Sequence, residues 1–188
     1  MSLFRWMKFA RVGYETAQYQ VVESDGPFEI RDYPELTLAT TEAKFEQQGR
    51  DGSFMKLFGY ISGANQDRAK IAMTTPVLMG KQSEGSMTQM GFVLPKEVAD
   101  VGAPIPCGAQ VEIRKRPAGR FAIIRFSGNL NLQSAQEHET KLRSWMSTKG
   151  LRADESGSPS VETAGYDPPF TPGALRRKKV LIRLGDSN

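Results

Sequence analysis

The chain has 188 residues, of which 39% are hydrophobic and 24% are charged, and its formal net charge is +4. A chain of this length forms one domain with a substantial core, and no apolar run approaches the roughly 20 residues that a membrane span needs. The single cysteine, Cys107, excludes an internal disulfide framework and a cysteine-based zinc site, which fits a cytoplasmic location.

One dense basic run, residues 176–179, stands out in the charge pattern. Net positive charge favours anionic partners through long-range attraction. The run precedes an apolar strand and lacks the interleaved aromatic residues that single-strand nucleic-acid binders use for stacking. We therefore interpret it as the solvated start of a strand and expect no nucleic-acid partner.

Residues 1–13 mix apolar and basic side chains and are expected to form an N-terminal arm or a short helix. The same mixture would suit an amphipathic segment that contacts a membrane surface, which is the less favoured interpretation. The segment lacks the continuous apolar stretch and the cleavage site of a signal peptide. The remaining residues, 14–188, are expected to fold as a single domain.

The first strands and helix follow from local patterns. Residues 19–23 and 28–33 flank an Asp-Gly turn and predict a hairpin, and a further strand is expected at residues 36–43. A helix then follows, with Asp51 and Ser53 as candidate N-caps. Its apolar residues recur at helical spacing and predict a face that packs on the core: Phe54, Leu57, Phe58 and Ile61.

The rest of the chain repeats this order. Residues 70–79 and 87–94 predict two strands, and Pro76 indicates an edge or a bulge in the first of them. A linker rich in proline and glycine follows at residues 95–108. The second half predicts strands at 111–116, 121–127, 161–166 and 180–184, and a helix that starts at a capping box on Ser134 and runs to about Lys149.

The two halves also match residue by residue. The Glu-Ile-Arg motif at residues 29–31 recurs at 112–114, and the proline and alanine that follow it recur at the same spacing. We expect an α+β fold in which duplicated ββαββ units, pseudo-repeats at about 19–95 and 109–185, form a distorted antiparallel β-barrel with two long helices packed on it. Such a fold offers a concave site where its halves meet.

Four motifs in order resemble the SOUL haem-binding family: Phe-Glu-Ile-Arg-Asp-Tyr-Pro at residues 28–34, residues 56–65, residues 70–77, and Gly-Tyr-Asp-Pro-Pro-Phe at residues 165–170. The resemblance runs from about residue 14 to residue 184. It implies a groove for haem or another tetrapyrrole between the first helix and the Pro-Pro loop. Carried over to this chain, the cofactor-binding positions are Arg50, Phe54, Met55, Lys56, Phe58, Ile61, Tyr166, Pro169 and Phe170.

His138 is the only histidine and therefore the candidate iron ligand. The alternative is a partly buried helix histidine that hydrogen-bonds to a neighbour. Some family members carry a histidine in the Glu-Ile-Arg motif, where this chain has Asp32. The other candidate ligands, each with a simpler structural role as the alternative, are Tyr60, Met73, Met79, Met87, Met90 and Cys107.

No nucleophile–base motif, phosphate loop or two-histidine metal site is present. We therefore expect a soluble haem-binding carrier or buffer without catalysis. One alternative is a small-molecule hydrolase of the gyrase-inhibitor-like domain type, whose groove carboxylates would act as general bases. These carboxylates would come from Glu29, Glu42, Glu112 and Glu162. A second alternative is a protein-interaction module that uses the proline-rich loop and the N-terminal arm.

Overall fold

A computed structural model describes residues 15–45, 51–81, 88–154, 159, 161–167, 172 and 175–185. The predicted N-terminal arm at residues 1–13 lies outside the described residues. So do four residues of the sequence-based predictions: Arg50, Met87, Pro169 and Phe170.

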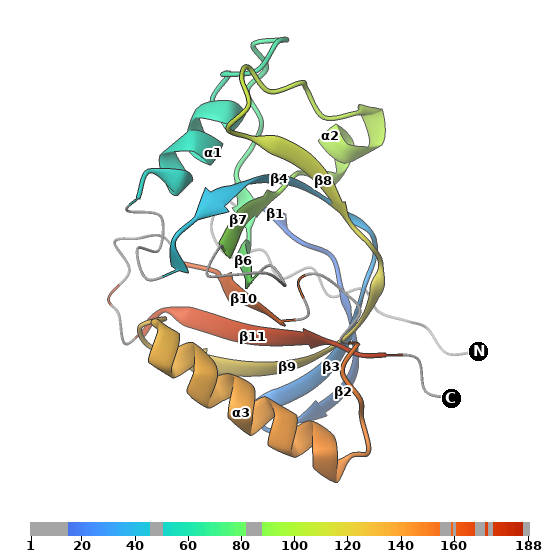
Figure 1. Cartoon of the computed structure of the whole chain (residues 1–188). Helices are drawn as coiled ribbons and strands as arrows, with labels where there is room; N and C mark the ends of the chain where they lie inside the picture. Colours follow the sequence, from blue (N-terminus) through green and yellow to red (C-terminus); the bar gives the residue numbers. More distant parts are fainter. Residues whose placement is uncertain are drawn as a thin grey trace, which may run out of the picture.

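The described elements alternate strands with three helices (Figure 1). The first half contains β1 (Glu15–Thr16), β2 (Gln20–Asp25), β3 (Phe28–Tyr33), β4 (Leu36–Ala43), α1 (Ser53–Ile61), β5 (Thr74–Thr75), β6 (Val77–Lys81) and β7 (Thr88–Val93). The second half contains α2 (Lys96–Val101), β8 (Glu112–Arg116), β9 (Gly119–Ser127), α3 (Leu132–Thr148), β10 (Val161–Gly165) and β11 (Arg177–Arg183).

Nine of these strands form one antiparallel sheet in the order β2-β3-β9-β11-β10-β6-β7-β4-β8. The mixed α+β class is confirmed, but the predicted barrel is wrong, because the edge strands β2 and β8 do not pair within the described residues. All six residues of β2 are exposed. This strand therefore has no apolar face to bury by closing against β8.

The sheet order does not confirm two self-contained ββαββ units. The two strands that precede each long helix are separated in the sheet, since β3 pairs with β9 and β4 pairs with β8. Strands are thus exchanged between the two halves of the chain. The duplication itself stays a prediction from the residue-by-residue match.

Two local corrections concern the middle of the chain. The predicted strand at residues 70–79 is split by Pro76 into β5, which pairs in parallel with β1, and β6, which joins the main sheet. Proline has no backbone N–H to donate, so a strand ladder breaks at this position. The linker at 95–108 contains the short helix α2, which the sequence patterns did not predict.

Alternation along the strands divides the core into three clusters. In β9, Ala122 and Ile124 point to the cluster under α3, whereas Phe121 and Ile123 point to the opposite, inner face of the sheet. A separate cluster lies under α1 and includes Leu57. Figure 1 shows α1 and α3 at opposite ends of the molecule, each covering the outer side of its own half of the sheet.

Neither long helix begins at its predicted N-cap. The N-cap of α1 is Gly52, not Asp51 or Ser53, and it makes no side-chain capping bond, although the Asp51 carboxylate accepts the Ser53 backbone N–H at 3.0 Å. The capping box of α3 starts at Asn131 and not at Ser134. Asn131 Oδ1 accepts the Ser134 N–H at 2.7 Å, and Ser134 Oγ accepts the Asn131 N–H at 3.1 Å.

Candidate functional site

The predicted helix positions divide between the surface and the core of α1. Ile61 is buried in the cluster beneath the helix, so it faces away from any surface ligand. Met55 and Phe58 are 62% and 41% exposed. Phe54 is half-buried and stacks against Phe58 with a ring-centroid distance of 6.3 Å. These three side chains, with the exposed Lys56, form an apolar surface that we call the α1 face.

The structure does not bring Tyr166 to the α1 face. Tyr166 follows β10 and packs with Tyr19 against the inner-face cluster. Burial raises the pKa of the Tyr166 hydroxyl well above its usual value. The proposed contact between α1 and the Pro-Pro loop stays a prediction, because Pro169 and Phe170 lie outside the described residues.

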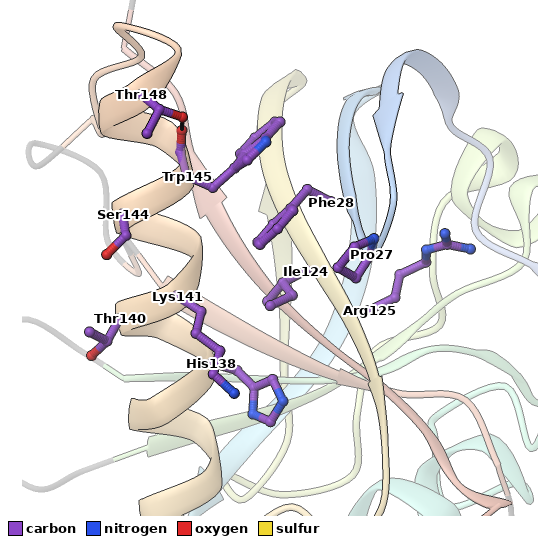
Figure 2. Close-up of a pocket in the computed structure, with 10 residues that line it drawn as sticks. All are labelled: Pro27, Phe28, Ile124, Arg125, His138, Thr140, Lys141, Ser144, Trp145 and Thr148. Carbon is purple, nitrogen blue, oxygen red and sulfur yellow. Dashed lines mark hydrogen bonds between the residues drawn. The ribbon is translucent and has the colours of Figure 1, made fainter.

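His138 lies elsewhere, in a groove between α3, β9 and the β2–β3 turn (Figure 2). The groove has a volume of about 560 Å³. We call it the α3 groove. It is lined by Pro27, Phe28, Ile124, Arg125, His138, Thr140, Lys141, Ser144, Trp145 and Thr148. The predicted iron ligand therefore belongs to a different surface from the predicted helix positions.

The imidazole of His138 is held in a defined orientation. Its Nδ1 lies 2.6 Å from the Ser134 carbonyl oxygen, and its ring stacks on Phe126 with a centroid distance of 3.8 Å. A carbonyl oxygen only accepts hydrogen bonds, so Nδ1 carries a proton, and Nε2 is the nitrogen that offers a lone pair whenever the imidazole is neutral. Metal-binding histidines show this pattern, in which the second nitrogen donates to a carbonyl.

The floor of the α3 groove is aromatic and its lining includes a lysine. Phe28 and Trp145 stack with a centroid distance of 5.0 Å and an interplanar angle of 4°. Trp145 Nε1 donates to Asp25 Oδ2 at 2.9 Å, which fixes the indole. The exposed Lys141 lies among the lining residues, whereas the Arg125 side chain points away from them in Figure 2 and its guanidinium pairs with Glu29 at 2.9 Å. The groove therefore combines apolar surface, a lysine and one imidazole.

Three of the other candidate ligands have structural roles. The hydroxyl of Tyr60 donates to the Pro104 carbonyl at 2.9 Å, and Met79 and Met90 are buried in the cluster beneath α1. Cys107 is an exposed free thiol. Across the described residues, no three His, Cys, Asp or Glu side chains gather into a metal-binding group.

Two buried ion pairs on the inner face were not predicted from the sequence. Glu29 pairs with Arg31, and Glu162 accepts from Arg116 Nε at 2.9 Å. All four residues are buried. Strand alternation points them inward, but sequence alone does not show that this face is covered.

The basic run at residues 176–179 does not form a continuous surface. Arg177 pairs with Asp167 at 2.8 Å, and Lys179 is buried on the inner face.

Within the described part of the chain, each helix is too short or too polar to span a bilayer.

An open antiparallel sheet with a helix over each half, and a groove lined by aromatic rings, a lysine and one oriented imidazole, defines a small ligand-binding α+β domain. The SOUL heme-binding protein family matches residues 14–183. The chain belongs to this family.

Known proteins of this type are similar along most of their length. Heme-binding protein 1 of Xenopus laevis is 27% identical over 170 residues, which cover 86% of each chain. Heme-binding protein 2 of Homo sapiens is 30% identical over 167 residues, which cover 82% of this chain and 79% of the human one.

Solved structures share the fold at much lower identity. A hydrolase from Listeria innocua matches with a TM-score of 0.61 at 10% identity, covering 87% of this chain and 94% of that one. The EcmrR C-terminal domain matches with a TM-score of 0.58 at 12% identity, covering 90% and 99%. At such identities the likeness shows the fold alone.

Proposed function

We propose that this protein binds haem or a related tetrapyrrole reversibly, as a carrier or buffer, and that His138 ligates the iron. The observation that carries the proposal is the His138 imidazole at the α3 groove, whose Nδ1 is anchored to the Ser134 carbonyl, so that Nε2 is the nitrogen left to bind a metal. Membership of a haem-binding family supports the ligand class.

The α3 groove supplies the parts that a haem site requires. A tetrapyrrole ring needs an apolar surface, which Phe28, Ile124 and Trp145 provide. Its propionates need a cation, and Lys141 among the lining residues supplies one, whereas Arg125 is already paired with Glu29. An imidazole is a common axial ligand. A groove that is open to solvent suits reversible loading better than permanent retention.

The α1 face is the second surface that fits a tetrapyrrole. It exposes Met55 and Phe58 beside Lys56, and the family resemblance points to this helix. Exposed apolar patches mark binding sites in soluble proteins. Haem bound there would not reach His138, because α1 and α3 cover different halves of the sheet.

Hemin titration followed by absorbance tests the proposal and distinguishes the two surfaces. We expect a saturable Soret shift at micromolar hemin that survives competition with albumin. His138→Phe keeps a ring to stack on Phe126 but removes the ligand, so it should abolish the His-ligated spectrum and weaken binding by about tenfold or more. Phe58→Ser, on the α1 face, is the control and should bind as the parent does.

Three results would contradict the proposal. A nonsaturating Soret shift would exclude specific haem binding. An unchanged spectrum in His138→Phe would exclude this ligand. Weak binding in Phe58→Ser together with normal binding in His138→Phe would move the site to the α1 face.

The proposal includes the absence of catalysis. The inner-face carboxylates that a hydrolase would use are already engaged, since Glu29 pairs with Arg31 and Arg125 and Glu162 pairs with Arg116. A carboxylate that accepts hydrogen bonds from guanidinium groups is a poor acceptor for a proton from water. This arrangement favours binding over hydrolysis.

A further inference from the structure

Lys179 is a buried lysine that has no polar partner among the described residues. It lies on β11, between Arg125 of β9 and Ala164 of β10, and it is 8% exposed. Its Nζ is 4.1 Å from the Tyr166 ring centroid and 5.5 Å from that of Tyr19. The ammonium forms no hydrogen bond or ion pair with any residue that the structure describes. An aromatic ring only partly replaces the water that an ammonium loses on burial.

Positive charge exceeds negative charge around Lys179. The carboxylate beside it on the inner face, Glu29, is already shared by Arg31 and Arg125. Three cations therefore surround one carboxylate. Buried charge without compensation is unfavourable, and it is normally paired with an opposite charge.

Burial, reinforced by the nearby Arg31 guanidinium, lowers the pKa of Lys179 to about 7. The lysine is therefore close to losing its proton at neutral pH. An incoming anion would supply the missing negative charge and restore the protonated form.

Two tyrosine rings lie against the Lys179 ammonium. Tyr19 and Tyr166 are half-buried, so part of each side chain reaches solvent. The Arg31 guanidinium lies 3.8 Å from the Tyr19 ring centroid. Phenol hydroxyls and guanidinium nitrogens can all donate hydrogen bonds to an oxygen ligand.

A second buried donor lies deeper on the same inner face. Arg116 is 7% exposed, and its Nη1 has no hydrogen-bond partner among the described residues. Its guanidinium lies 5.1 Å from the ring centroid of Tyr33, whose hydroxyl accepts from Arg31 at 3.4 Å. Tyr33 therefore links the two groups of cations.

We propose that Lys179 and Arg31, enclosed by Tyr19 and Tyr166, bind the oxyanion group, a carboxylate or a phosphate, of a small ligand at the inner face of the sheet. This site is distinct from the α3 groove, because Lys179 is on the opposite side of β11 from Val180 and Ile182, which pack under α3. The excess of cations excludes a cationic ligand.

Binding at this site is coupled to a proton. The groups that act on Lys179 are Tyr19 before β2, Glu29 and Arg31 on β3, Arg125 on β9, Tyr166 after β10 and Arg177 on β11. The arginines stay charged and Glu29 stays paired with them, so Lys179 is the group that titrates near neutrality. Anion affinity should therefore fall as the pH rises above about 7.

Isothermal titration of the whole protein with inorganic phosphate and with benzoate tests the proposal. We expect one saturable site, and the preferred probe distinguishes a tetrahedral from a planar oxyanion. Lys179→Met should weaken binding about tenfold or more. Lys178→Met is the matched control: its side chain is on the other face of β11, and its affinity should equal that of the parent. Lys179→Arg should keep binding.

Proton uptake gives a readout that needs no variant. Titrations at pH 7 in buffers of different ionisation enthalpy should show that the parent protein takes up a fraction of a proton with the anion. Absence of saturable binding of both probes up to about 10 mM, equal binding by Lys179→Met, or binding without proton uptake would each overturn the proposal. Hemin binding is measured separately, so either proposal can fail without the other.

Discussion

At the residue scale, the identity of a side chain can be read from the sequence, whereas its environment depends on the folded structure. His138 could be singled out from the sequence because it is the only histidine, and its helical position and partial burial were anticipated. Lys179 could not be singled out in this way, because it lies in a basic run that has the pattern of a solvated strand start. Its burial depends on the side chains of β3, β9 and β10 that surround it.

The pH dependence of folding should report the burial of Lys179. The unfolded lysine keeps its proton up to its ordinary pKa of 10.5, whereas in the folded protein this pKa is about 7. Between these values the unfolded state binds more protons, so raising the pH stabilises the folded state, by up to about 1.4 kcal/mol per pH unit.

Urea unfolding at several pH values measures this effect. Lys179→Met should be more stable than the parent at pH 7, and its advantage should shrink toward pH 10. Substitution of the exposed Lys56, Lys56→Met, serves as the control for general charge effects. A stability difference that is independent of pH would contradict the lowered pKa.

At the element scale, periodicity located the helices better than it located their ends and buried faces. The α1 stripe was predicted as Phe54, Leu57, Phe58 and Ile61, but the buried apolar residues are Leu57, Tyr60 and Ile61. Tyr60 replaces Phe58 because its hydroxyl reaches the Pro104 carbonyl, so its ring can be buried. Phe58 is left on the surface.

The start of α3 can be tested directly, because the structure places the N-cap at Asn131. Asn131→Ala removes the acceptor for the Ser134 N–H and should lower the free energy of unfolding by about 1 kcal/mol. Asn131→Ser retains a capping oxygen and should stay close to the parent. Thermal unfolding by circular dichroism measures both. An unchanged melting temperature in Asn131→Ala would place the helix start elsewhere.

At the scale of the whole molecule, the buried pair Arg116–Glu162 joins distant parts of the sheet. Arg116 is on the edge strand β8, and Glu162 is on β10, with β6, β7 and β4 between them in the sheet order. The sheet must curl for these side chains to meet at hydrogen-bonding distance. The pair therefore holds the curvature of an open sheet.

Breaking this pair should destabilise the protein strongly. Glu162→Gln leaves the buried Arg116 without its counter-charge and should cost about 3–5 kcal/mol of unfolding free energy. Glu112→Gln removes the exposed partner of Arg114 and should cost less than about 1 kcal/mol. Chemical denaturation of both variants provides the comparison. Similar small costs would show that the pair does not hold the curvature.

Local patterns in the sequence were enough to predict the α+β class, most of the strands and both long helices, because alternation and helical periodicity are local properties of the chain. The sequence also supplied the motifs that carry the family resemblance. Long-range packing was needed to show that β3 and β8 exchange places, that the sheet stays open, that His138 and α1 belong to different surfaces, and that Lys179 is buried. These features depend on pairing and burial between residues far apart in the chain, and no local pattern records which distant side chains will cover a given face.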